Sequence, residues 1–144
     1  MSKLESIVPP LELCKQIPAG EFEDSALVWD IHGHGKFDKW HVEKRVNRSV
    51  RFGDYGIMSP PHADIPAPTL AEILAKIPAA INGVGVLELA LDDRAENNDG
   101  RYVICYNRYG VDGALEETTQ LESDNNSATA ALRLWLRVRQ EAGR

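Results

Sequence analysis

The stretch Asn125–Arg139, with the sequence NNSATAALRLWLRVR, has the pattern of a capped amphipathic helix. The polar residues at its start can accept hydrogen bonds from the first free backbone N–H groups. Apolar residues then recur at helical spacing, so one face of the helix has to be buried against another element. A second stretch, Pro66–Pro78 (PAPTLAEILAKIP), also has the pattern of a helix with one face to be buried. Thr69 and Glu72 in it have the spacing of a capping box. Together the two stretches predict one small folded domain of the α+β class over residues 1–144.

Alternating apolar and polar residues predict a β-hairpin in the first half of the chain. Ser25–His32 and Phe37–Val46 have the alternation of strands, and His34-Gly35 between them suits a tight turn. If these two residues form the loop, Trp29 lies opposite Trp40. A cross-strand aromatic pair of this kind stabilises a two-stranded ribbon.

The same register sorts the side chains of the hairpin by polarity. One face is mostly polar, and it holds Val28, Asp30, His32, Lys39, His41 and Glu43. The other face is apolar, has Leu27 opposite Val42, and holds Leu27, Trp29, Ile31, Trp40, Val42 and Val46. We therefore expect the second face to lie against the core.

The remaining pattern predicts one more helix and a meander. Pro9–Ile17 has the proline start and apolar spacing of a short helix. Val86–Leu91, Arg101–Tyr106 and, more weakly, Ala114–Leu121 follow one another as strands separated by turn residues. The predicted order is α, ββ, α, βββ, α. This order predicts a two-layer fold in which about three helices pack on an antiparallel sheet made of the hairpin and the meander.

Composition limits the class of protein. The chain has 144 residues, of which 43% are hydrophobic and 26% charged, and these values argue against disorder. The net charge of −6 argues against non-specific nucleic-acid binding by the whole surface. No signal-peptide core or membrane-spanning run is evident, so we expect a soluble, cytoplasmic protein. Cys14 and Cys105 lack any disulfide or metal spacing, and two buried free thiols are expected.

One basic segment stands out on this acidic chain. Lys36–Arg51 holds six basic and two acidic residues, a net charge of +4 that leaves −10 for the rest. With Phe37, Trp40 and Phe52 it could bind nucleic acid by phosphate contacts and base stacking. In the hairpin register above, however, Trp40 faces the core and is removed from any stacking platform. A nucleic-acid-associated module is therefore an alternative rather than the favoured function.

The hairpin also brings four candidate metal ligands together in sequence. Asp30, His32, His34 and His41 lie within twelve residues, and imidazole with carboxylate suits Zn²⁺. The register separates His32 from His41 by roughly 13 Å at ~3.3 Å per residue. Asp30 can approach His41 diagonally, or His32 on its own strand, but two ligands do not make a structural site. A small metal-dependent enzyme using Asp30, His32 and His41 is the second alternative.

Other motifs are incomplete. Gly83-Val84-Gly85 is followed by a strand and so is no dinucleotide fingerprint. The acidic loop Asp92–Gly100 lacks the alternation and closing glutamate of a calcium loop. Neither cysteine stands in a nucleophile motif with a histidine. Accordingly, no residue is assigned as catalytic, cofactor-binding or metal-binding, and enzymatic activity is uncertain, with the balance against it.

Three blocks of the chain carry a resemblance. Leu11–Trp29 (LELCKQIPAGEFEDSALVW), Pro66–Pro78 and Asn125–Arg139 together resemble short, uncharacterised open reading frames of tailed phages and prophages of gut bacteria. The resemblance does not extend over Ile31–Ile65. It implies a structural unit of phage or prophage type, and it supplies no activity, cofactor or site residue.

These observations favour a non-enzymatic accessory protein that acts by binding another protein or by self-association. The exposed side of the last helix is one expected contact surface, because it carries four arginines beside Trp135, namely Arg133, Arg137, Arg139 and Arg144. The basic hairpin is the other. An unpaired edge of the meander could also build a dimer.

Overall fold

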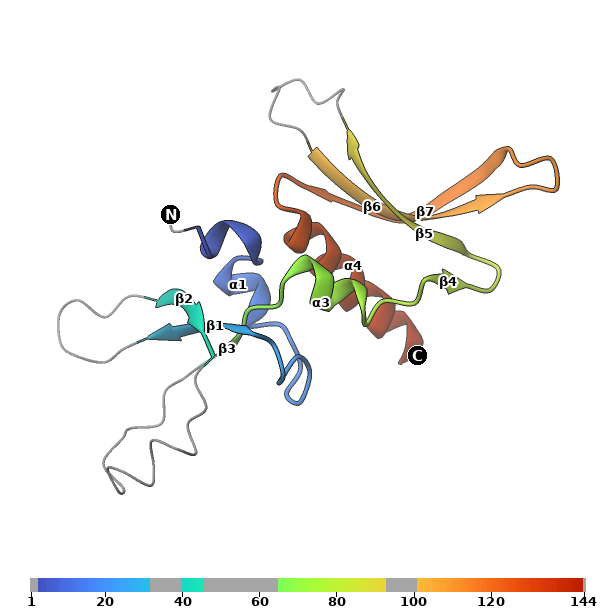
Figure 1. Ribbon diagram of the computed structural model, residues 1–144. Coiled ribbons are helices and arrows are strands. Elements are labelled where there is room, and N and C mark those ends of the chain that lie inside the picture. Colours follow the sequence, from blue (N-terminus) through green and yellow to red (C-terminus); the bar gives the residue numbers. More distant parts are fainter. Residues whose placement is uncertain (1–2, 32–39, 46–64, 93–100, 144) are drawn as a thin grey trace.

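The computed structural model describes residues 3–31, 40–45, 65–92 and 101–143 (Figure 1). Its elements follow the predicted order with two short strands and one short 3-10 helix (η1) added. In sequence they are η1 (Glu5–Ile7), α1 (Leu11–Cys14), β1 (Leu27–Ile31), β2 (Trp40–Lys44), β3 (Ile65–Pro66), α3 (Leu70–Leu74), β4 (Ala80–Ile81), β5 (Gly85–Asp92), β6 (Arg101–Tyr109), β7 (Leu115–Asp124) and α4 (Ser127–Ala142). The predicted α+β class is confirmed.

The strands form two antiparallel sheets instead of one. The first has the order β2-β1-β3 and the second the order β4-β5-β6-β7. Figure 1 shows α4 between them, with β6 and β7 on one side and α3 and α1 on the other. The predicted hairpin and the predicted meander thus both exist, but each is built into its own sheet. Among the described residues, no helix has the length and apolarity needed to cross a bilayer.

Helix α4 begins as its sequence predicts. The Asn126 side-chain oxygen accepts a hydrogen bond from the backbone N–H of Thr129 at 3.1 Å, which caps the helix. The Asn126 amide donates to the Val8 carbonyl at 2.9 Å and so ties the N-terminal segment to the helix start. The buried face of α4 is continuous and consists of Ala128, Thr129, Ala130, Ala131, Leu132, Leu134 and Trp135. The small residues at its start allow the neighbouring elements to approach closely.

Helix α3 has the predicted capping box, and its glutamate does more than cap. Glu72 accepts hydrogen bonds from the Thr69 backbone N–H at 2.8 Å and the Thr69 hydroxyl at 3.1 Å. The same carboxylate accepts from the Ala26 backbone N–H at 3.0 Å and the Ser25 hydroxyl at 3.2 Å. Glu72 therefore links α3 to the segment that enters β1, 46 residues away in sequence.

Replacing Glu72 with alanine is expected to cost about 1–2 kcal/mol in the free energy of unfolding, because α3 loses its capping carboxylate and the backbone N–H groups of Thr69 and Ala26 lose their acceptor. Burial raises the pKa of Glu72, but the hydrogen bonds from Thr69, Ala26 and Ser25 together lower it below its usual value. A lowered folded-state pKa gives stability that is present at neutral pH and is lost as pH falls through the acid range.

The measurement is urea unfolding at a series of pH values. Glu72→Gln should flatten the acid slope of stability relative to the native chain. Glu12→Gln is the matched control, since Glu12 pairs with Lys15 on the exposed surface. Equal acid slopes for the native chain and Glu72→Gln would show that the linking role is wrong.

The register of the β1–β2 hairpin differs from the predicted one by two residues. Trp29 pairs with Val42, and Trp40 pairs with Ile31, so the expected Trp29–Trp40 pair is wrong. The chain between the strands, including the predicted His34-Gly35 turn, lies outside the described residues. A shift of two residues keeps every side chain on its predicted face, so the polarity pattern cannot detect it.

The apolar face of the hairpin is buried as predicted, and part of the polar face is buried as well. Leu27, Trp29 and Val42 belong to the core, and the Trp29 ring N–H donates to the Pro9 carbonyl at 3.1 Å. Val28 and Asp30, on the opposite face, are 2% and 1% exposed. Sheet β2-β1-β3 is therefore covered on both faces around β1, which simple alternation does not predict.

Candidate functional site

Sheet β4-β5-β6-β7 has one face that packs partly against the core and one face that none of the described helices covers. On the core-facing side, Leu89, Leu91 and Tyr102 near the inner end of the strands are 38%, 57% and 37% exposed. Successive side chains of a strand point to opposite faces. Ile104 and Tyr106 of β6 are fully buried beneath α4. Cys105 between them points to the other side, here called the open face. The residues that share this face by alternation and pairing are Val86, Glu88, Ala90, Asp92, Arg101, Val103, Cys105, Asn107, Tyr109, Leu115, Thr118 and Ser123. Figure 1 shows the β6–β7 part of this sheet projecting away from the helices.

The centre of the open face is a hydrogen-bonded cluster drawn from three strands. Glu88 of β5 accepts a hydrogen bond from the Tyr109 hydroxyl at 2.6 Å and another from the Asn107 amide at 2.6 Å. Asn107 in turn accepts from the Thr118 hydroxyl of β7 at 2.6 Å. The Cys105 thiol lies 3.5 Å from the same Asn107 oxygen. Glu88, Asn107, Tyr109 and Thr118 are thus fixed by one another across the sheet.

The protonation states of the cluster follow from these contacts. Hydrogen bonds from Tyr109 and Asn107 hold the pKa of Glu88 below its usual value, so it is ionised at neutral pH. The hydrogen bond to Glu88 raises the pKa of Tyr109, which stays protonated. Burial and then the Glu88 charge raise the pKa of the Cys105 thiol. The cluster therefore offers hydrogen-bonding groups and an inert thiol, not an activated nucleophile.

Both cysteines are free and buried, as predicted, and their reactivity provides a direct check. Burial raises the pKa of Cys14 to about 12, compared with 9.0 for an ordinary thiol. At neutral pH the thiolate fraction of Cys14 is therefore about a thousandfold below that of a free cysteine. We expect Cys14 to resist alkylation in the folded chain and Cys105 to react slowly, as followed by mass spectrometry. Labelling of Cys14 at the rate seen in denaturant would contradict its place in the core.

Exposed apolar side chains surround the polar cluster. Val86 is 43% exposed, Tyr109 44% and Leu115 54%. Tyr109 and Leu115 lie opposite each other at the outer end of the β6–β7 hairpin. Val111, in the turn between these strands, is completely exposed. Exposed apolar side chains that lie close together on a surface mark a candidate contact site between proteins.

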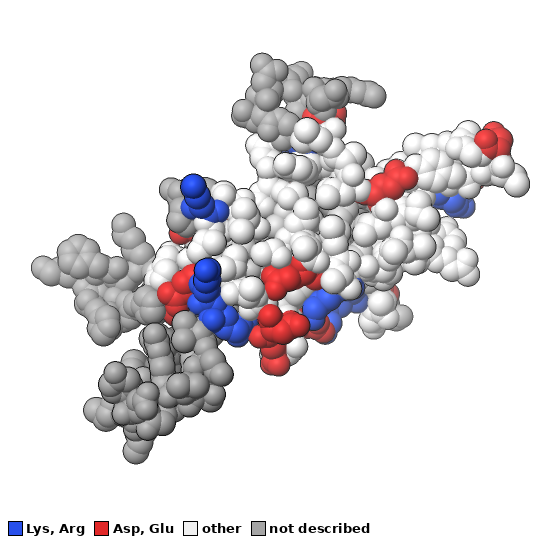
Figure 2. Space-filling view, in the orientation of Figure 1, with Lys and Arg blue, Asp and Glu red and all other residues white. Residues whose placement is uncertain are grey.

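The open face carries little net charge. Glu88 is the only charged residue in its central cluster, and Asp92 and Arg101 lie opposite each other at the inner end of the strands. Figure 2 shows, for the side it presents, charged side chains gathered along the lower edge, whereas the β6–β7 hairpin at the right carries isolated charges. On a chain of net charge −6, this face is comparatively neutral.

The residues of the predicted metal site are only partly brought together. Asp30 lies directly opposite His41 in the β1–β2 register, so the two are cross-strand neighbours and not the diagonal pair expected. The His41 ring lies 3.1 Å from the carboxylate of Glu43. His32 and His34 lie outside the described residues. Within the described part of the chain, no three His, Cys, Asp or Glu residues are placed to hold one metal ion.

The basic segment and the C-terminal arginines also have defined places. Of Lys36–Arg51, the structure describes residues 40–45, in which Trp40 packs partly against the core as expected. On α4, Trp135 is only 6% exposed and belongs to the core. The arginines described on α4 pair with acidic side chains: Arg133 with Asp124, Arg137 with Glu122 and Arg139 with Glu21. The described arginines of α4 are thus paired within the chain while remaining partly exposed, and Trp135 lies in the core.

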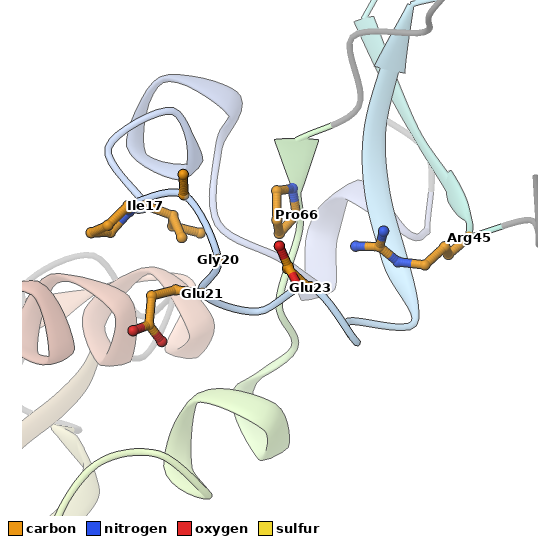
Figure 3. A pocket seen from close by; sticks show the side chains of 8 residues that line it. Ile17, Gly20, Glu21, Glu23, Arg45 and Pro66 are labelled. Carbon is orange, nitrogen blue, oxygen red and sulfur yellow. The ribbon is translucent and has the colours of Figure 1, made fainter.

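Two shallow hollows occur elsewhere on the described surface. One of about 220 Å³ lies between the Ile17–Glu23 loop and Arg45, and Figure 3 shows Arg45 and Glu23 on two sides of it. The Nε atom of Arg45 donates to the Ser25 carbonyl at 2.8 Å. A second hollow of about 480 Å³ lies at the start of α4, beside Ile7 and Tyr102. Neither collects the convergent polar groups that the open face does.

Comparison with protein families, with curated proteins and with solved structures finds no match to this chain.

The sequence analysis did not predict the open face, although the apolar residues on both sides of β6 indicate it. Val103, Cys105 and Tyr109 on one side of β6 are nearly as apolar as Tyr102, Ile104 and Tyr106 on the other. A strand that is apolar on both sides predicts contacts on both faces of its sheet. Only one of these faces is covered by α4.

Proposed function

We propose that this chain is a non-enzymatic accessory protein, of phage or prophage type and cytoplasmic, that binds another protein through the open face of sheet β4-β5-β6-β7. The proposal assigns no reaction and no cofactor to the chain. The proposed contact surface lies on the meander strands. The sequence had favoured the last helix and the basic hairpin.

The observation that carries the proposal is the pairing of an apolar rim with a polar centre that is already ordered. Tyrosine is enriched at protein interfaces. The Tyr109 hydroxyl is held by Glu88 at 2.6 Å before any partner arrives. A side chain that is fixed in advance loses less conformational entropy on binding, so more of its contact energy contributes to affinity.

A capture experiment with matched variants tests the proposal. Tagged native chain, Leu115→Glu and Leu91→Glu are each incubated with lysate of the organism that encodes the protein. Leu115 and Leu91 are 54% and 57% exposed, but Leu91 lies on the helix-facing side of the sheet. Both substitutions add one negative charge at a similarly exposed site, and they lie on opposite faces and at opposite ends of the sheet.

We expect one protein to be retained in stoichiometric amount at moderate salt by the native chain and Leu91→Glu, and to be lost with Leu115→Glu. Additional copies of the chain itself count as such a protein, and a differently tagged copy in the lysate reports them. Equal retention by all three would place the contact elsewhere. Nucleic acid that elutes with salt, with no protein partner, would favour the basic segment Lys36–Arg51 instead.

A further inference from the structure

We infer that Asn82 is a site of spontaneous deamidation in the folded chain, by ring closure onto the backbone nitrogen of Gly83. The reaction uses water and no enzyme, so it is independent of the proposed function. Its result is a slow change of charge and of main-chain length in the turn between β4 and β5.

The chemistry depends on two neighbouring groups. The backbone nitrogen of Gly83 gives up its proton and attacks the side-chain carbonyl carbon, Cγ, of Asn82. A bond from this nitrogen to Cγ forms, the bond from Cγ to the side-chain amide nitrogen breaks, and the amide nitrogen leaves as ammonia with the proton that Gly83 gave up. Water then opens the succinimide ring at either carbonyl carbon. The products are aspartate and isoaspartate, in which the main chain runs through the former side chain.

The fold leaves both reacting groups available. Ile81–Val84 form a β-turn, which is closed by a hydrogen bond from the Val84 N–H to the Ile81 carbonyl at 3.0 Å. Gly83 has φ 81°, the value for the third position of a type II turn, where the N–H lies outside the closing hydrogen bond. Among the described residues, none is hydrogen-bonded to the Gly83 N–H or to the Asn82 side chain.

The surroundings of the turn are also open. Asn82 and Gly83 are both exposed. Apart from the chain neighbours of Gly83, no atom lies within 4 Å of the place that a Cβ atom on it would take. Because glycine has no Cβ atom, nothing shields its nitrogen from the Asn82 side chain.

Asp112-Gly113, in the β6–β7 turn, is the corresponding pair that the fold protects. The Gly113 N–H donates to the Gly110 carbonyl at 2.9 Å, because Gly113 is the last residue of its turn. The Asp112 carboxylate accepts from the Ala114 N–H at 3.1 Å. Both groups that would form the ring are therefore held in place.

The other asparagines in the described part of the chain are held as well. The side-chain amides of Asn107 and Asn126 donate hydrogen bonds at 2.6 Å and 2.9 Å. The nitrogen that follows Asn125 donates to the Asp124 carboxylate at 2.9 Å. None of the three is followed by glycine. Asn82 is thus the described asparagine that the fold exposes to this reaction.

Conversion to isoaspartate should disturb the pairing of β4 with β5. Ala80 pairs with Val86 and Ile81 with Gly85, so the turn joins the two paired segments directly. Isoaspartate lengthens the main chain of this turn by a carbon atom. Asn82→Asp adds the same negative charge without the extra atom. We therefore expect the isoaspartate form to unfold at a lower urea concentration than Asn82→Asp.

Incubation of the folded native chain, followed by tryptic digestion and mass spectrometry, tests the inference. The tryptic peptide of residues 77–94 contains Asn82 as its only asparagine. We expect this peptide to be replaced with time by two separable forms with the mass of the acid, and faster as the pH is raised, because Gly83 must lose a proton. The peptides that hold Asn107 and Asn126 should keep their amides. An unincubated sample, digested in parallel, corrects for conversion during digestion.

Asn82→Gln is the matched variant. Glutamine keeps the amide but would have to close a larger ring, so the conversion should be lost. Circular dichroism checks that the chain stays folded throughout the incubation. The inference is overturned if Asn82 of the folded chain keeps its amide for as long as the same chain in urea needs to convert. Conversion of Asn107 or Asn126 as fast as Asn82 would overturn it as well. Equal urea midpoints for the isoaspartate form and Asn82→Asp would reject the effect on strand pairing.

Discussion

Replacing Trp135 with alanine is expected to lower the free energy of unfolding by about 3–5 kcal/mol, the range for truncating a buried aromatic side chain. Trp135 is 6% exposed, and its ring lies edge-on to Phe22 with the ring centroids 4.9 Å apart. The Arg139 guanidinium lies 5.5 Å from the Trp135 ring centroid and pairs with Glu21 at 2.5 Å. Trp135 therefore joins α4 to the loop before β1 through several contacts at once.

The loss in the free energy of unfolding should exceed the cost of the cavity alone. Phe22 has φ 58°, a left-handed conformation that costs a non-glycine residue of this size on the order of 1–3 kcal/mol. Its ring is buried in the core between Trp135 and Lys76, and loss of Trp135 removes part of this packing. Urea unfolding followed by circular dichroism measures the effect. Trp135→Phe should recover part of the stability, and Arg133→Ala, on the exposed side of α4, should change it by less than about 1 kcal/mol. A loss below about 1 kcal/mol for Trp135→Ala would show that this contact does not organise the core.

Replacing Gly85 with alanine is expected to cost about 3 kcal/mol or more. Gly85 has φ 139°, which L side chains rarely adopt, and it lies at the start of β5. A Cβ atom added there would lie 2.4 Å from the backbone oxygen of Asn107 and 2.5 Å from its carbonyl carbon. Because both atoms belong to the backbone of β6, no side chain can move aside to relieve the clash. The pairing of β5 with β6 has to shift.

Gly83→Ala is the matched control. Gly83 lies two residues earlier, at φ 81°, with nothing within 4 Å of an added Cβ. It should therefore show only the backbone cost of about 1–2 kcal/mol. Urea unfolding of both variants separates steric clash from backbone strain. Equal losses for the two variants would mean that the close approach of Gly85 to Asn107 does not exist in solution. Since Val86 and Asn107 belong to the open face, Gly85→Ala should also weaken any association that uses it.

Helix starts and strand identities could be predicted from the sequence because their causes are local. Asn126 and the Thr69–Glu72 pair cap their helices through side chains within three residues of the groups they satisfy. The three meander strands likewise follow from alternation and turn residues along the chain. The free, buried state of Cys14 and Cys105 followed from their apolar neighbours.

The remaining features depend on contacts distant in sequence. The two-residue shift in the β1–β2 hairpin preserves both faces, so no polarity pattern selects between the registers. Strands β3 and β4 have two residues each, too few to show alternation. The strands divide into two sheets because α4 packs between them, and this packing depends on contacts between residues distant in sequence. The open face was hidden for the same reason: only the position of α4 reveals which apolar side of β6 stays uncovered.

The measurement that tests the open face most directly is a pair of ¹H–¹⁵N correlation spectra of the labelled native chain, one recorded alone and one with the unlabelled protein that the tagged chain retains. We expect amide shifts on addition of this protein to centre on Val86, Asn107, Tyr109, Leu115 and Thr118, while the amides of α4 and of Leu91 stay constant. Shifts confined to α4 or to the β1–β2 hairpin, with the open face unchanged, would contradict the assignment of this face as the contact surface.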